Sequence, residues 1–160
     1  MDISRKTDYA LRMLAMLAEG NESLLSVRTA AEAVDVPYSF ARSIQHGLVQ
    51  SGIVESLRGV RGGMRLRLEP SEITIRQIVE AVQGPLVMND CTAEEGMCPR
   101  MECCCYHPIW VGAQELLRDY LDSVTLDDVV NHRQYPAVDV KFTDRDRFVE
   151  YASCGKVCGK

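Results

Sequence analysis

The sequence predicts a mainly α-helical protein with one small β-hairpin, and three observations support this fold class. Apolar residues recur at helical spacing in several separate segments. Residues 64–68 instead alternate between apolar residues and arginines, which is typical of a half-buried strand with a basic outer face. The glycine-rich stretch at residues 59–63 comes directly before this strand and can form the turn of a hairpin.

The first part of the chain is expected to hold three helices. Residues 5–19 carry apolar side chains at helical spacing. Ser26 is placed to cap a short second helix. A break at residues 35–37 then leads into a third helix over residues 38–50, whose first turn Pro37 fits.

The later elements are expected in the following order: strands at residues 53–58 and 64–68, then helices at 73–82, 108–124 and 126–131. Thr125 and the two aspartates after it suit the start of the last helix. The helix over 108–124 carries a continuous apolar stripe, which includes Ile109, Trp110, Ala113, Leu117 and Leu121. This stripe is larger than one short helix needs to bury, which suits packing against a second copy.

Helix, short helix, tight turn, second helix and glycine-tipped basic hairpin together form a winged helix-turn-helix pattern. The second helix of such a pair presents its N-terminal side chains to base edges in the major groove of double-stranded DNA. Here those side chains belong to Tyr38, Ser39, Arg42 and Ser43. The hairpin arginines that would meet phosphates are Arg58, Arg61 and Arg65. The alternative is a small α+β domain whose arginines are merely solvated.

The net charge of −5 does not oppose this interpretation. The chain has 160 residues and a pI near 5.2, but residues 1–84 hold equal numbers of acidic and basic residues, so the excess negative charge lies beyond them. No segment approaches the length of a membrane span, and the N-terminus lacks a signal-peptide pattern. We therefore expect a cytoplasmic protein with no membrane partner.

The seven cysteines are unevenly distributed, and five of them lie between residues 91 and 105. Cys91, Cys98 and Cys104 are too widely spaced for a zinc-ribbon pair, and this spacing suits thiolates that wrap an iron–sulfur cluster. Three cysteines leave one coordination position open, and His107 could supply an imidazole.

Two other interpretations of the cysteines stay open. A structural zinc ion could use Cys98, Cys103 or Cys104, and His107. A metal-free thiol switch could use the neighbouring thiols of Cys103, Cys104 and Cys105. A small iron–sulfur electron-transfer protein is a further alternative, of another class. The sequence shows no phosphate loop and no catalytic triad pattern, so we do not expect an enzyme.

Several stretches resemble the IscR/NsrR/RirA-type winged-helix transcription regulators, which carry cysteine-ligated iron–sulfur clusters. They are Thr7-Asp8-Tyr9-Ala10-Leu11-Arg12, the hairpin Leu57-Arg58-Gly59-Val60-Arg61-Gly62-Gly63, Glu72-Ile73-Thr74-Ile75 with Ile78-Val79-Glu80-Ala81-Val82, the three spaced cysteines, and Val124-Thr125-Leu126-Asp127-Asp128-Val129-Val130. Together they span about residues 3–132. Asp35 stands where the family usually has a turn glycine, and aspartate tolerates the left-handed backbone that such a turn needs.

The resemblance implies a homodimer that binds a pseudo-palindromic operator as a repressor, controlled by a 2Fe-2S or 4Fe-4S cluster that senses nitric oxide, redox state or iron–sulfur status. Its cysteine ligands would be Cys91, Cys98 and Cys104. The fourth ligand would be His107 or Asp8 of the partner subunit, with Cys103 and Cys105 as substitutes.

This organisation divides the chain into four parts: a DNA-binding domain at 1–84, a cysteine-rich cluster loop at 85–107, a dimerisation helix with a short following helix at 108–132, and a polar flexible tail at 133–160.

Overall fold

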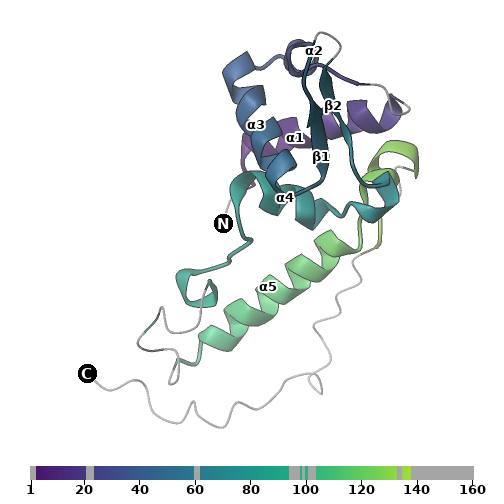
Figure 1. Ribbon diagram of the computed structural model, residues 1–160. Coiled ribbons are helices and arrows are strands. Elements are labelled where there is room, and N and C mark those ends of the chain that lie inside the picture. Colours follow the sequence, from purple (N-terminus) through teal and green to yellow (C-terminus); the bar gives the residue numbers. More distant parts are fainter. Residues whose placement is uncertain are drawn as a thin grey trace.

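The computed structural model describes residues 3–20, 24–59, 62–93, 98, 100, 104–132 and 135–137. Helices α1 to α4 and a two-stranded hairpin pack into one body, and the long helix α5 extends away from it (Figure 1). The prediction of a mainly helical protein with one small β-hairpin is confirmed.

The elements follow one another as α1 (Arg5–Glu19), α2 (Val27–Ala33), α3 (Tyr38–Gln50), β1 (Val54–Leu57), β2 (Gly63–Leu66), the 3-10 turn η1 (Pro70–Glu72), α4 (Ile75–Gln83), the 3-10 turn η2 (Asp90–Thr92), α5 (His107–Asp122) and the π-helical turn η4 (Asp128–His132). The first and third helices have the bounds that apolar spacing predicts.

The starts of α2 and α3 follow from local side-chain chemistry. The Ser26 hydroxyl accepts a hydrogen bond from the Thr29 N–H at 3.0 Å, so the predicted cap is confirmed. Pro37 lies at the N-cap of α3, one position before the first turn where we expected it. The fixed φ of proline suits this extended residue, and its carbonyl accepts a hydrogen bond from the Ala41 N–H at 3.1 Å.

The hairpin strands are shorter than the alternation predicts. Met64 in β2 is fully buried, as expected, but Leu68 lies beyond the strand and is 39% exposed. Pro70 begins η1 only two residues later and turns the chain away from the sheet. The alternation therefore describes the strand as far as residue 66 and not beyond it.

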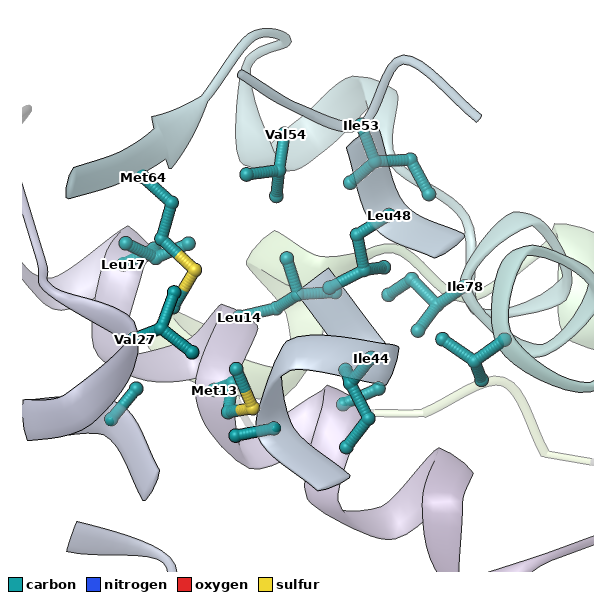
Figure 2. Close-up of a cluster of buried hydrophobic side chains, with 14 of the residues drawn as sticks. Met13, Leu14, Leu17, Val27, Ile44, Leu48, Ile53, Val54, Met64 and Ile78 are labelled. Carbon is teal, nitrogen blue, oxygen red and sulfur yellow. The ribbon is translucent and has the colours of Figure 1, made fainter. Parts of the chain in front are cut away.

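The core lies where α1, α3, the hairpin and α4 meet. Figure 2 shows side chains from all of these elements pointing toward one another; the labelled residues are Met13, Leu14, Leu17, Val27, Ile44, Leu48, Ile53, Val54, Met64 and Ile78. Helices α3 and α4 pack closely at Gly47, where a Cβ atom would lie 2.5 Å from the Ala81 carbonyl oxygen in α4. Burial of this apolar surface is what holds α3 with its outer face toward solvent.

The C-terminal end of α5 lies against this body. The Ile75 N–H donates to the Val124 carbonyl at 2.9 Å, and the Leu126 N–H donates to the Ile73 carbonyl at 2.8 Å. Ile73 and Val124 are therefore extended residues beside the helices to which the apolar spacing assigned them. The short helix expected over 126–131 begins at residue 126 and becomes the π-helical turn η4.

An ion pair also joins α4 to α5. The Arg76 Nε donates to Asp122 Oδ2 at 2.7 Å, and the Thr74 hydroxyl donates to Oδ1 of the same carboxylate at 3.1 Å. The hydrogen bond to Asp122, together with the nearby negative charges, raises the pKa of Arg76. Both ends of the link are polar and partly exposed, so it orients α5 without burying its apolar stripe.

Candidate nucleic-acid interface and cysteine site

The predicted base-contacting residues lie together on α3. Tyr38, Ser39, Arg42 and Ser43 occupy its first two turns, and all four are exposed. Ala41, Ile44 and Leu48 face the core from the opposite side of the helix and are fully buried. This arrangement presents a polar helix face of the kind that enters a major groove.

The turn before α3 depends on Asp35. Its φ is +53°, and it is the one non-glycine residue with a positive φ in the described part of the chain. The expected left-handed conformation is therefore confirmed. Since this residue sets the direction in which the chain leaves α2, it also sets the angle at which α3 presents its outer face.

The hairpin arginines differ in how free they are. Arg58 is exposed at the end of β1 and makes no ion pair within the described residues. Arg65 pairs with Glu55, which lies directly opposite it in the sheet register. Arg61 lies outside the described residues. Arg58 is therefore the best placed of the described hairpin arginines to meet a phosphate.

Two hairpin glycines serve the protein's own packing. A Cβ at Gly62 would overlap the Leu57 carbonyl oxygen, and one at Gly63 would lie 2.9 Å from the Leu25 carbonyl oxygen. Gly59 has a φ of +121° and open space around it, so it is the glycine that leaves room for close approach of another molecule.

Arg28 is a candidate contact that the sequence analysis missed. Its guanidinium lies over the Tyr38 ring, with Cζ 5.1 Å from the ring centroid, so a second exposed cation sits beside α3. The available signal was its position in the first turn of α2, two residues after the Ser26 cap.

The described cysteines lie in the chain segment that joins α4 to α5. Cys91 is in η2, and Cys91, Cys98 and Cys104 are all half-buried, whereas Cys105 is exposed. Cys103, Cys154 and Cys158 lie outside the described residues. Within the part of the chain that is described, no three His, Cys, Asp or Glu side chains lie close enough together to hold a metal ion.

The two candidates for a fourth ligand have different surroundings. Asp8 is exposed on α1, where a second copy could reach it. His107 is the first residue of α5, and its Nδ1 atom is buried with no hydrogen-bond partner among the described residues. A buried nitrogen without a partner is costly, so this lone pair suits a metal ligand. Three half-buried thiols and this imidazole have the donor chemistry that an iron–sulfur cluster requires.

Gln114 holds the Cys91 segment against α5, and the sequence analysis missed it. This side chain is 6% exposed, and its Oε1 accepts hydrogen bonds from the Met88 N–H at 2.8 Å and the Thr92 hydroxyl at 2.7 Å. Its Nε2 donates to the Thr92 carbonyl at 3.3 Å. No pattern in the sequence marks Gln114, because its burial and its hydrogen bonds depend on packing against residues 88–92.

The apolar stripe on α5 is largely uncovered in the single chain. Ile109 is 59% exposed and Trp110 38% exposed, while Ala113, Leu117 and Leu121 are half-buried. Apolar side chains clustered on one helix face mark an interaction surface.

Comparison with known proteins agrees with this arrangement. The Rrf2 family, described as iron-dependent transcriptional regulators, matches residues 3–132. The chain belongs to the Rrf2 family. Protein aau3 of Rhizobium meliloti is 33% identical over 134 residues, which cover 83% of this chain and 87% of that protein. The HTH-type transcriptional regulator NsrR of Shouchella clausii is 30% identical over 132 residues, which cover 81% of this chain and 89% of that protein.

A solved structure with the same fold is that of CymR, the global cysteine regulator of B. subtilis. It is 26% identical with a TM-score of 0.65, and the match covers 82% of this chain and 98% of CymR. The predicted winged-helix fold and the resemblance to IscR and NsrR are therefore confirmed.

The Rrf2 membership makes this chain a DNA-binding transcription regulator and not an enzyme. Among its described helices, none is long and apolar enough to cross a membrane.

Proposed function

We propose that this Rrf2 protein is a cytoplasmic homodimeric repressor, and that an iron–sulfur cluster bound at its cysteine loop controls its affinity for a pseudo-palindromic operator. The observation that carries the proposal is the position of the cysteines. Cys91, Cys98 and Cys104 are half-buried in the segment that joins the DNA-binding body to α5. A group bound there lies in the segment that links the part that meets DNA to the part that meets the partner.

In the proposed complex, α3 of each subunit enters a major groove with Tyr38, Ser39, Arg42 and Ser43 facing the bases. Arg58, Arg61 and Arg65 of the hairpin meet the DNA backbone, Arg65 after it exchanges Glu55 for a phosphate. The exposed stripe of α5 packs against the same stripe of the partner, which sets the distance between the two α3 helices.

The cysteine loop would then connect the state of the cluster to the distance between the two α3 helices. Cys91, Cys98 and Cys104 would bind the cluster together with His107, whose buried Nδ1 has no described partner. When bound, the cluster supplies a group that reacts with oxidants or nitric oxide and that is lost when iron–sulfur supply fails. Drawing the three cysteines together would move the Cys91 turn, and Gln114 would carry this movement to α5. The cluster-bound and cluster-free states then differ in their affinity for the operator, as regulation requires.

Anaerobic purification with a visible spectrum and iron and sulfide assays tests this proposal. Ser substitutions at Cys91, Cys98 and Cys104 should each abolish the absorption, whereas the exposed Cys105 offers a matched control whose Ser variant stays coloured. His107→Ala and Asp8→Ala identify the fourth ligand, since only the true ligand's variant should lose or shift the absorption. A colourless protein that takes up one zinc and no sulfide after reconstitution would show that the cluster proposal is wrong.

A regulator that responds through its thiols or through zinc is the second candidate. One observation favours it: the thiol of Cys105 is exposed. In that case Ser substitution at Cys103 or Cys105 should abolish the response to oxidants, with DNA binding measured before and after treatment with peroxide and with a thiol reductant.

A further inference from the structure

Gln45 is a buried polar residue between α3 and the hairpin. It is 5% exposed, and Thr7 and Gln114 are the other buried polar residues among those described. A polar side chain is kept in such a place when its hydrogen bonds do something that an apolar side chain could not do. Both ends of the Gln45 amide are engaged, so its orientation is determined.

The two partners of Gln45 belong to the two elements that face DNA. Arg42 Nη1 donates to Gln45 Oε1 at 3.0 Å, and Gln45 Nε2 donates to Ser56 Oγ at 3.1 Å. Arg42 lies one turn earlier on the exposed face of α3, and Ser56 is in β1, two residues before Arg58. The chain of hydrogen bonds therefore runs from the base-facing side of the helix to the strand that ends at the free hairpin arginine.

We propose that Gln45 is a positioning residue for base recognition, which orients the Arg42 guanidinium and ties that orientation to the position of the hairpin. This inference rests on the proposed docking of α3 in the major groove. A free arginine loses much side-chain freedom when it is fixed on a base, and holding one N–H in advance reduces that loss. The remaining N–H donors of Arg42 stay available for the O6 and N7 acceptors of a guanine, which arginine matches in a bidentate manner.

The hydrogen bond to Ser56 adds a second consequence. When Arg58 meets a phosphate, any shift of β1 moves Ser56 and with it the Gln45 amide. Arg42 would then be aimed correctly only when the hairpin is seated. Base recognition and backbone contact thus act together rather than independently.

Variants of Arg42, Gln45 and Ser56 test this inference with a defined probe. The probe is a duplex that the wild-type protein enriches from a pool of randomised double-stranded DNA, together with all its single base-pair variants. Arg42→Ala identifies the base pair that Arg42 reads, because discrimination there should fall. Gln45→Met, which keeps the side-chain volume but not the hydrogen bonds, should reduce discrimination at the same base pair by about three- to tenfold. Other positions and the salt dependence should be unchanged.

Gln45→Glu and the double variant of Arg42 and Gln45 distinguish a positioning role of Gln45 from a role in stability alone. Gln45→Glu still accepts from Arg42 and from the Ser56 hydroxyl, so it should restore discrimination. Adding Gln45→Met to Arg42→Ala should have no further effect at the Arg42 base pair. Ser56→Ala changes only an exposed residue and should produce a smaller loss at that base pair even if Gln45→Met folds poorly.

An equal loss of affinity for all duplexes in Gln45→Met and Ser56→Ala would overturn the inference, as would an additive effect in the double variant. If Arg42→Ala changes discrimination at no base pair, the inference is wrong while DNA binding by the family fold stands. If the wild-type protein enriches no sequence at all, the proposed docking of α3 fails first.

Discussion

The Thr92 hydroxyl donates a hydrogen bond of 2.7 Å to the side chain of Gln114. Thr92 directly follows Cys91, and Gln114 is the one described residue of α5 that is buried. The turn that carries the first candidate ligand is therefore tied to the helix that carries the candidate dimer surface. Arg118 adds a second link from the same helix, since its Nη2 donates to the Leu86 carbonyl at 3.1 Å.

Gln114→Met should release this turn. The variant keeps the volume of the side chain but leaves the Met88 N–H without its acceptor, and the Thr92 hydroxyl keeps only the Asn89 carbonyl. We expect a loss of about 1–3 kcal/mol in the free energy of unfolding, measured with urea. Hydrogen exchange should also become faster at residues 88–92 but not in the core of α3.

The neighbouring Glu115 supplies the control for this variant. It is exposed on the same helix, so Glu115→Gln should leave both the unfolding free energy and the exchange rates unchanged. Unchanged exchange at residues 88–92 in Gln114→Met would contradict the proposed link between Cys91 and α5.

Ile109→Glu should dissociate the proposed dimer without unfolding the subunit. Ile109 is 59% exposed in the single chain, so a carboxylate there costs little in a monomer but is buried and unpaired in a dimer interface. Sedimentation equilibrium should show the wild type as a dimer and the variant as a monomer. Tyr135→Glu alters a similarly exposed apolar residue outside α5 and should remain dimeric. A dimeric Ile109→Glu protein would place the interface elsewhere.

Asp128 should titrate below its ordinary value of 3.8. The backbone N–H of Thr125 is the main cause of the lowered pKa, and the Thr125 hydroxyl adds to it, because both hydrogen bonds favour the charged carboxylate. A lowered folded-state pKa adds stability above the unfolded-state pKa, and that stability is lost as the pH falls through the folded-state pKa.

Carboxyl NMR titration checks the pKa of Asp128 directly. Thr125→Val removes the hydroxyl donor but keeps the backbone donor, so the midpoint should rise only part of the way to the ordinary value. Asp128→Asn should make the unfolding free energy less sensitive to pH in the acid range. A midpoint at the ordinary value in the wild type would show that these hydrogen bonds are not kept in solution.

The effect of a substitution at Asp35 on the free energy of unfolding should depend on backbone conformation alone. With a φ of +53°, a β-branched residue is strained, so Asp35→Val should lower the free energy of unfolding by about 1–2 kcal/mol. Asp35→Gly should be neutral or slightly stabilising, because glycine adopts this region without strain. Thermal unfolding of the two variants beside the wild type makes the comparison, and equal effects of valine and glycine would show that the turn conformation is not the cause.

Local patterns in the sequence were sufficient to predict most of the helices and strands, and which face of each helix is buried. Apolar spacing placed α1 and α3 correctly, and Ser26 and Asp35 behave as their side-chain chemistry predicts. The exposed positions on α3 follow from the same spacing, since the residues opposite a buried stripe must face solvent. Apolar spacing wrongly assigned Ile73 and Val124 to helices, although both are extended. A buried apolar residue beside a helix cannot be distinguished by spacing from one inside it.

The tertiary structure alone decided which polar groups meet. The sequence predicts Arg65 as a cation free to meet a phosphate. The register of the hairpin places it opposite Glu55, with which it forms an ion pair. Gln45 and Gln114 carry no pattern of their own, and only packing brings them to Ser56 and Thr92. The physical reason is that apolar burial depends on periodicity within one element, whereas a hydrogen bond depends on two atoms from different elements meeting within about 3 Å.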